Sequence, residues 1–245
     1  GPKWCGKTTT ALQVANSVLR MDEPSKRESN LKMSEIDPSR LLQGVTPRLI
    51  DEWQIAPKIW DAVRYEVDCR GEEGQFILTG SAVPVETKEI THSGAGRFTW
   101  LTMRTMSLYE SQESSGEVSL EELFDSPDKI SGSNAHDIDS LAFLICRGGW
   151  PHAIGMKRKA ALSQAEDYFD AVVKSDINRA DGVNKNPERV KRLMRSYARY
   201  QGAQITGTAL RDDIFANETE TISEDTVLSY VNALKKIFVI EDMPS

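Results

Sequence analysis

The chain has 245 residues, of which 39% are hydrophobic and 27% are charged, and its formal net charge is −7. This composition is typical of a soluble globular protein with one large domain or two modest ones. The negative charge argues against wholesale coating of nucleic acid, although it leaves room for a local basic face. No apolar run approaches the roughly 18 residues that span a bilayer, so we do not expect a membrane protein.

The first eight residues read G-x-x-x-x-G-K-T, the Walker A pattern of a phosphate-binding loop. Its glycines let backbone N–H groups turn toward phosphate oxygens, while Lys7 can reach the β- and γ-phosphates and Thr8 can ligate Mg²⁺. A helix is predicted to follow over residues 8–20. A chance glycine-rich turn is the alternative. The predicted nucleotide contacts are Gly1, Pro2, Lys3, Trp4, Cys5, Gly6, Lys7, Thr8 and Thr9.

The position of this loop predicts that the sequence is an internal fragment of a longer protein. A phosphate loop follows a buried strand, and here the first residue is already the first glycine of the loop. The sequence also stops shortly after the apolar run Ile237–Ile240. We therefore expect both an N-terminal and a C-terminal truncation.

Asp51 and Glu52 directly follow the short apolar run Leu49-Ile50, which is a Walker B pattern. Asp51 is predicted to hold Mg²⁺, usually through water, and Glu52 to polarise the attacking water. Taken alone, such a string is most often a strand end with solvated acids. Its place after a Walker A loop favours the catalytic interpretation.

Two further groups could complete a site for ATP hydrolysis. The predicted strand Phe76–Ser81 ends in polar residues, so Thr79 or Ser81 could sense the γ-phosphate, or either could simply cap the strand. A glycine-bearing loop then delivers Arg97, which could act as an arginine finger in its own chain or in a neighbour, and Arg104 is a weaker candidate. Both arginines could instead be structural.

The intervening segments show mixed patterns. Short strands are predicted at Leu31–Met33 and Phe98–Met103, and an amphipathic helix at Ile55–Cys69. The three cysteines and three histidines are scattered, so neither a disulfide framework nor a zinc site is expected. Cysteine usage together with ATP chemistry points to the cytoplasm.

The last third of the sequence is predicted to be helical. After a Gly-Gly-Trp-Pro break, one helix is expected over Lys159–Asp176, and three more begin near Pro187, Thr206 and Ser223. A strand at Ile237–Ile240 would complete a winged-helix outline. Three arginines share one face of the Pro187 helix and could meet DNA, although such faces are more often merely solvated: Arg192, Arg195 and Arg199.

Together these motifs resemble those of bacterial and archaeal AAA-superfamily ATPases, which carry a P-loop core, a winged-helix module and a nuclease-like C-terminal domain of unknown function. The resemblance rests on Gly1–Thr8, Leu49–Gln54, Ile77–Ser81, Ser93–Arg97, Met106–Glu110 and Gly148–Pro151. It implies that Arg97 is the finger, with a possible homo-oligomer, and that Pro151 belongs to a turn packing near the adenine. Two parts of such proteins are absent from this sequence, the first core strand and the nuclease-like domain.

We therefore expect an α/β fold in which a parallel-sheet P-loop core with helices on both faces precedes a helical and winged-helix module. The expected divisions are an ATPase core over 1–125, a linker over 126–140, a lid-like helical segment over 141–185 and a winged-helix-like module over 186–245. The expected function is hydrolysis of ATP to ADP and phosphate with Mg²⁺, coupled to a conformational change. The alternatives are a nucleotide-gated switch with little turnover and a DNA-directed ATPase of mobile-element or defence systems.

Overall fold

The structure is a computed structural model that describes residues 1–83, 94–215 and 223–242. The chain divides into two compact units, and each is described by itself. The first unit comprises Gly1–Lys3, Lys7–Thr102 and Ala171–Ser245. The second comprises Trp4–Gly6 and Met103–Asp170. The predicted domain divisions at 125, 140 and 185 follow the sequence alone and stay predictions.

A three-stranded parallel sheet forms the centre of the N-terminal part of the first unit. Its strands are β1 (Ser17–Arg20), β2 (Arg48–Asp51) and β3 (Phe76–Thr79), in the spatial order β1-β2-β3. The register pairs Arg20 with Asp51 and Asp51 with Thr79, so the carboxyl ends of the three strands lie at one edge of the sheet. This sheet confirms the parallel α/β core predicted from the sequence.

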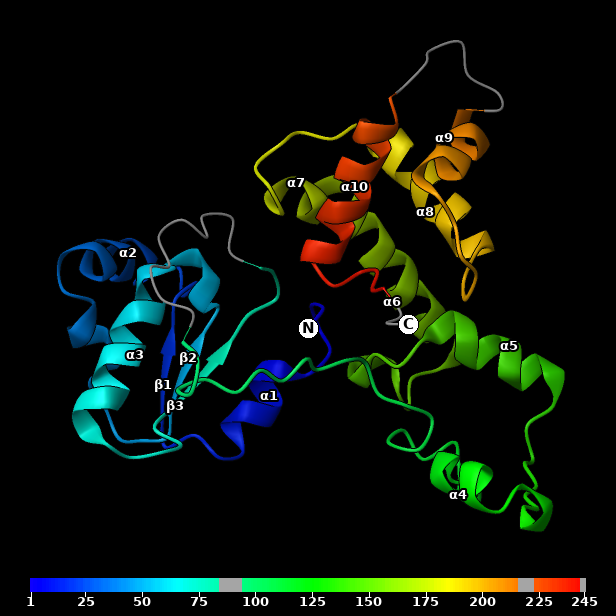
Figure 1. The fold of residues 1–245 in the computed structure, drawn as a ribbon, viewed down its shortest axis with the longest axis horizontal. Helices are drawn as coiled ribbons and strands as arrows, with labels where there is room; N and C mark the ends of the chain where they lie inside the picture. Colours follow the sequence, from blue (N-terminus) through cyan, green and yellow to red (C-terminus); the bar gives the residue numbers. More distant parts are fainter. Residues whose placement is uncertain (84–93, 216–222, 243–245) are drawn as a thin grey trace. The chain divides into compact units, whose positions relative to one another are not determined.

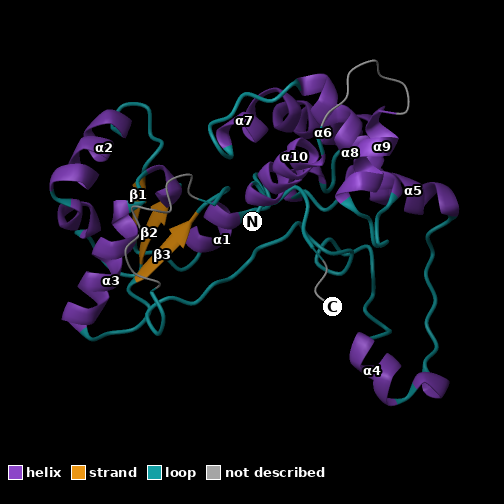
Figure 2. Cartoon of the chain, turned by 45° about the horizontal axis from the view of Figure 1, so that its top comes forward, coloured by secondary structure: helices purple, strands orange, loops and turns teal. Residues whose placement is uncertain are grey.

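Helices cover the sheet on both sides. Helices α2 (Arg27–Ile36) and α3 (Lys58–Arg70) connect successive strands in one direction, which places both on the same face when the crossovers are right-handed. Figures 1 and 2 show α1 (Lys7–Leu12) across the sheet from them. A core of buried apolar side chains fills the space under α2 and α3: Met21, Leu41, Leu42, Ile50, Trp53, Ala56, Ile59, Trp60 and Val63.

Three predictions for this region were wrong. The helix after the loop ends at Leu12, and residues 17–20 form β1 because Val18 and Leu19 pair with β2 instead of continuing the helix. Leu31–Met33 lies inside α2, where Asn30 and Ser34 face the interior. Phe98–Met103 forms no strand, since Phe98 stacks on Trp60 of α3 with the ring centroids 3.7 Å apart.

The C-terminal part of the first unit is a helical bundle. A π-helical turn (Val172–Asp176) leads into α7 (Ile177–Arg179), and three longer helices follow: α8 (Pro187–Arg199), α9 (Gly207–Phe215) and α10 (Glu224–Lys236). Asn186 caps α8 by accepting hydrogen bonds from the backbone N–H groups of Glu188 and Arg189, and Ser223 caps α10. The three helices confirm the predicted helical tail.

The winged-helix prediction fails at its last element. Residues 237–240 form a turn and bends, and Phe238 has φ 59°, which is incompatible with an extended strand. Ile237 is instead the C-cap residue of α10 and is buried. The described residues from 186 to 242 therefore form the helices α8, α9 and α10 but no wing strand.

The second unit is helical and loop-rich. Its helices are α4 (Leu120–Asp125), α5 (Ile138–Arg147) and the main part of α6 (Arg158–Ala171), whose last residue belongs to the first unit. The backbone of Met106 donates a hydrogen bond to Gly149 O at 2.8 Å, an approach so close that a Cβ on Gly149 would overlap the Met106 backbone. The predicted break at Gly148–Pro151 therefore has a packing reason as well as a turn-forming one.

Candidate functional site

The site is built at the carboxyl edge of the sheet, where Asp51 ends β2 and Thr79 ends β3. The Asp51 side chain is 7% exposed and accepts three hydroxyl hydrogen bonds. Thr8 Oγ1 lies 2.9 Å from Oδ1 and 3.1 Å from Oδ2, and Thr79 Oγ1 donates to Oδ1 at 2.6 Å. Parallel pairing of β2 with β3 thus brings Asp51 beside Thr79, and Thr8 on α1 joins them although the sequence separates all three widely.

Asp51 has no cationic neighbour within salt-bridge distance in the described part of the chain. Burying a carboxylate without a cation is costly. A cation bound from solution would offset this cost. The Asp51 carboxylate and the hydroxyl groups bonded to it are hard oxygen donors, the kind of ligand that Mg²⁺ prefers. Within the described residues no group of three or more His, Cys, Asp or Glu could hold a metal.

The phosphate loop carries a lysine folded across it. Lys7 Nζ donates to the carbonyl oxygen of Pro2 at 2.5 Å, a partner that phosphate oxygens could replace. Gly6 has φ 99°, a conformation that a side chain would strain, and Trp4 has φ 63°. Because α1 is only six residues long, Lys7 and the loop backbone, rather than a long helix dipole, are the groups here that could bind an anion.

Neighbouring side chains hold the loop in each unit. In the first unit, Lys3 Nζ lies 2.6 Å from the buried Asp176 carboxylate at the end of the π-helical turn. In the second unit, Cys5 is fully buried, and its thiol lies 3.7 Å from Met103 O. Thr9 is exposed on α1.

Pro151, the predicted adenine contact, lies beside the phosphate loop. A Cβ on Gly6 would come within 3.7 Å of Pro151 Cγ, and the neighbouring Trp150 packs on Tyr168 with ring centroids 4.3 Å apart. Trp4 contacts the same tyrosine ring, with centroids 5.5 Å apart. The second unit therefore brings the middle of the loop and the Pro151 turn together.

Glu52 follows Asp51 in a left-handed conformation, with φ 56° and ψ 40°. Such a backbone is unusual for a residue with a side chain, and residues held this way are frequent at functional sites. The Glu52 carboxylate receives two hydrogen bonds on Oε2, from Gln54 Nε2 at 2.6 Å and from Ser81 Oγ at 3.2 Å. Ser81, the alternative sensor, thus contacts Glu52, whereas Thr79 contacts Asp51.

Gln54 is a polar contact that the sequence analysis missed. The signal available was its place two residues after Glu52, where a tight turn can bring a long amide back toward the carboxylate. The 3-10 turn Trp53–Ile55 has this effect. The other amide atom, Oε1, is buried and has no hydrogen-bond partner among the described residues, a state that costs about 1–3 kcal/mol.

Arg97 lies away from these acids within the chain. Its Nε is 2.8 Å from Asp68 Oδ1, near the C-terminal end of α3. That end of α3 adjoins the start of β3, because the Arg70 guanidinium lies over the Phe76 ring at 5.1 Å. The hydrogen bond from Arg97 lowers the pKa of Asp68 and raises that of Arg97. Ser93, in the same predicted loop, lies outside the described residues.

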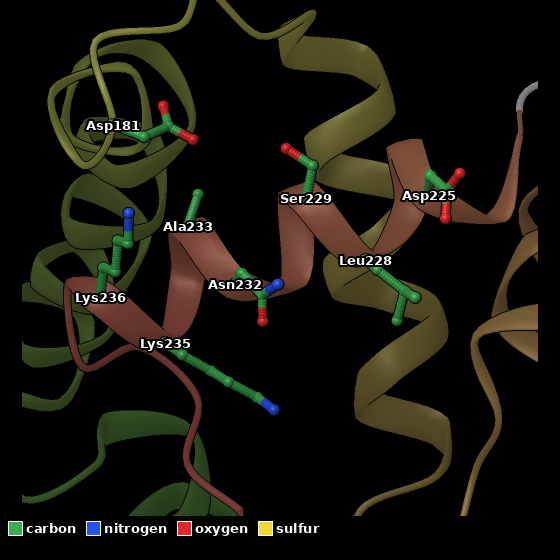
Figure 3. A pocket seen from close by; sticks show the side chains of 8 residues that line it. All are labelled: Asp181, Asp225, Leu228, Ser229, Asn232, Ala233, Lys235 and Lys236. Carbon is green, nitrogen blue, oxygen red and sulfur yellow. The ribbon is translucent and has the colours of Figure 1, made fainter.

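A separate hollow of about 650 Å³ lies along α10. Figure 3 shows Asp225 at one end of it, Asn232 near its middle, and the Lys236 amine turned toward the loop that carries Asp181. Asp181 is already bonded to the buried Lys185. None of the predicted site residues lines this hollow.

Comparisons with known proteins find two family matches. Residues 1–112 match the model of an AAA domain, and residues 138–245 match the model of a domain of unknown function (DUF8612). The first match supports an AAA-type P-loop ATPase for the N-terminal part. Neither a curated protein nor a solved structure matches the chain. In the described ranges, none of the helices has the length and apolar character needed to cross a membrane.

Proposed function

We propose that the protein hydrolyses ATP to ADP and phosphate with Mg²⁺. The observation that carries the proposal is the buried Asp51 carboxylate, which has hydroxyl donors from Thr8 and Thr79 but no cation partner in the described part of the chain. The AAA domain match over residues 1–112 supports the same reading. Bound Mg²⁺ would neutralise charge on the β- and γ-phosphates.

The chain's own residues divide the work of hydrolysis. The loop Gly1–Thr8 wraps the phosphates, and Lys7 exchanges the Pro2 carbonyl for β- and γ-phosphate oxygens. Thr8 and Asp51 would hold Mg²⁺, while Glu52 would accept a proton from the attacking water. Thr79, bonded to Asp51, is the proposed sensor of the γ-phosphate. Pro151, which lies beside Gly6, stays a predicted adenine contact.

The ion pair between Lys3 and Asp176 offers a route by which nucleotide could affect the helices. Asp176 ends a π-helical turn, an irregularity frequent at functional positions in helices. Phosphate bound by the loop would compete with Asp176 for Lys3. We therefore propose that nucleotide state changes the π-helical segment, which is also what the alternative of a slow nucleotide switch requires.

Steady-state ATP turnover by the purified protein tests the main proposal, with Lys7→Ala and Glu52→Gln as variants. Loss of a general base typically lowers the reaction rate about 100- to 10,000-fold, so Glu52→Gln should lose turnover while it still binds nucleotide. Lys7→Ala should lose both turnover and affinity. Unchanged turnover in Glu52→Gln would remove Glu52 as water activator, and absence of nucleotide binding by the unaltered protein would refute the proposal.

Arg97 is proposed to act in a neighbouring copy, because in its own chain it is bonded to Asp68. Mixing Lys7→Ala protein with Arg97→Ala protein tests this directly. One copy then supplies an intact loop and the other an intact arginine, so turnover should return only in mixed assemblies. Two variants that stay inactive when mixed would contradict a finger acting between copies.

DNA-directed activity is the second candidate, favoured by the exposed side chains of Arg192 and Arg195 on α8. Arg199 is on the same face but forms an ion pair with Asp213. The test is ATP turnover with and without duplex DNA over a range of salt. Stimulation that falls with salt would support this candidate, and DNA-independent turnover would count against it.

A further inference from the structure

We propose that Gln54 and Ser81 are positioning residues for Glu52, and that Gly80 is glycine to leave room for the Gln54 amide. This inference rests on the proposed function, because it assigns how the water-activating carboxylate is oriented. It also gives each residue of Thr79-Gly80-Ser81 a separate task. Thr79 holds Asp51, Gly80 admits Gln54, and Ser81 holds Glu52.

The two hydrogen bonds reach the same atom of the Glu52 carboxylate. Gln54 Nε2 and Ser81 Oγ both donate to Oε2, at 2.6 Å and 3.2 Å, and they come from two different segments of the chain. A carboxylate held at one oxygen from two directions loses rotation about its last bond. The other oxygen, Oε1, is left with its lone pairs for an incoming water.

Gly80 lies against the far side of the Gln54 amide. A Cβ added at Gly80 would overlap Gln54 Oε1 and would come within 3.4 Å of Trp53 Nε1. Gly80 does not have a positive φ, so the backbone conformation alone does not require glycine there. The close approach of the amide is therefore the physical reason for the missing side chain.

The unsatisfied Gln54 Oε1 argues against a purely structural amide. The atom is buried and unbonded within the described residues, while the Nε2 end is committed to Glu52. An apolar side chain of similar volume would fill the same space without burying an orphan acceptor. Buried unpaired polar atoms in a folded protein call for such an explanation, and orienting Glu52 provides one.

Orientation matters because the proton transfer is directional. The proton of the attacking water passes to Glu52 Oε1, and the water oxygen forms its bond to the γ-phosphorus. The bond between the γ-phosphorus and the bridging oxygen breaks, which leaves ADP and phosphate. A general base must lie within hydrogen-bond reach of the proton it takes, so a carboxylate free to rotate would be less effective.

The first test separates turnover from nucleotide affinity. Gln54→Met retains the side-chain volume without its donor, and Ser81→Ala removes the hydroxyl. Each should lower kcat by about 10- to 100-fold, as loss of a supporting hydrogen bond does at other sites, with KM for ATP within about twofold. Ser81→Thr keeps the hydroxyl and should restore most of kcat. An unchanged or raised kcat in both Gln54→Met and Ser81→Ala would overturn the inference.

A matched control is available at the other end of β3. Gln75 also donates its amide to a carboxylate, Glu72 Oε2 at 3.0 Å, but at the opposite end of the strand from Asp51. Gln75→Met makes the same chemical change there and should leave kcat unchanged. An equal loss in Gln75→Met would mean that the effect of Gln54→Met is not specific to Glu52, which would also overturn the inference.

The decisive test repeats Gln54→Met in a Glu52→Gln background. If Gln54 acts through Glu52, the second substitution should cause no further loss of kcat. An additional tenfold loss would contradict this route. If kcat falls in Glu52→Gln but stays normal in Gln54→Met and Ser81→Ala, only the positioning role is refuted. If kcat is normal in Glu52→Gln, the proposed base itself is refuted.

Gly80→Ala tests the same arrangement without altering either donor. The added methyl group should displace the amide, so kcat should fall as in Gln54→Met while KM stays constant. In a Gln54→Ala background the space is free, and Gly80→Ala should then have no further effect on kcat. A full loss in that background would contradict the proposed clearance. Thermal unfolding of each variant verifies that the folded protein is being compared.

Discussion

Carboxylates at the sheet edge and in the helical parts of the chain are satisfied in different ways. Among the described residues, Asp51 and Glu52 receive hydrogen bonds from hydroxyl and amide groups only. In the helical parts, Asp181 is bonded to the amine of Lys185, and Glu113 is bonded to the guanidinium of Arg147. The buried cations Lys185 and Arg147 have side chains that are 1% and 4% exposed.

This difference distinguishes the ion pairs of the helical parts from Asp51 and Glu52, which are proposed to act on a ligand. A buried ion pair neutralises itself, so removing one partner leaves the other charge without compensation. A buried carboxylate that has only neutral donors retains a net charge, which a metal and its nucleotide can satisfy. Replacing an aspartate by asparagine should therefore lower turnover at the sheet edge and lower the free energy of unfolding in the helical parts.

The largest contrast is expected at Asp51. Asp51→Asn should lower Mg²⁺-dependent turnover by at least about 100-fold, because a neutral amide is a poor replacement for a metal carboxylate. Its free energy of unfolding should stay the same or rise, since an unpaired buried charge is removed. Turnover across a Mg²⁺ titration and urea denaturation measure the two effects. Full activity in Asp51→Asn would contradict a role for this carboxylate in metal binding.

Asp181→Asn is the corresponding change in the helical bundle. It should lower the free energy of unfolding by roughly 3–5 kcal/mol, because the Lys185 amine stays buried without its carboxylate. Turnover of the protein that remains folded should be unaffected. The double variant Asp181→Leu/Lys185→Met should recover most of the loss, measured by urea denaturation. A loss below about 1 kcal/mol would show that Lys185 finds another partner.

The ion pair between Glu113 and Arg147 should make the stability of the second unit depend on pH. The Arg147 guanidinium is the main cause of a pKa for Glu113 below its ordinary 4.5, and the Ser111 hydroxyl adds to it. The resulting stabilisation is complete above 4.5 and is lost as the pH falls through the pKa of the folded protein. Denaturation of the protein and of Glu113→Gln should thus differ most above pH 4.5 and converge in acid. A constant difference would contradict this linkage.

The smallest effect is expected at a helix cap. Asn186 accepts hydrogen bonds from Glu188 N at 2.9 Å and Arg189 N at 3.2 Å, so Asn186→Ala should cost about 1 kcal/mol of stability. Asn184→Ala, two residues earlier and exposed, is the matched control and should have almost no effect. Equal losses at the two positions would argue against the cap.

Several local features were predictable because they depend on neighbours in sequence. The helices beginning near Lys58, Pro187 and Ser223 carry their own apolar stripes or caps, and the structure confirms them. The strand at Val18–Leu19 was mistaken for helix because its identity depends on pairing with β2. The strand predicted at Ile237–Ile240 was wrong because Ile237 is buried at the end of α10 instead of pairing in a sheet.

The sequence by itself determined which residues are the candidates for the site and which chemistry they predict. Lys7, Thr8, Asp51 and Glu52 are recognisable from spacing, because phosphate and Mg²⁺ binding demand those residue types in that order. Only the tertiary structure decided which groups meet: Thr79 with Asp51, Ser81 and Gln54 with Glu52, and Arg97 with Asp68. The reason is geometric, since parallel strand ends and a left-handed turn bring together side chains whose separation along the chain carries no such information.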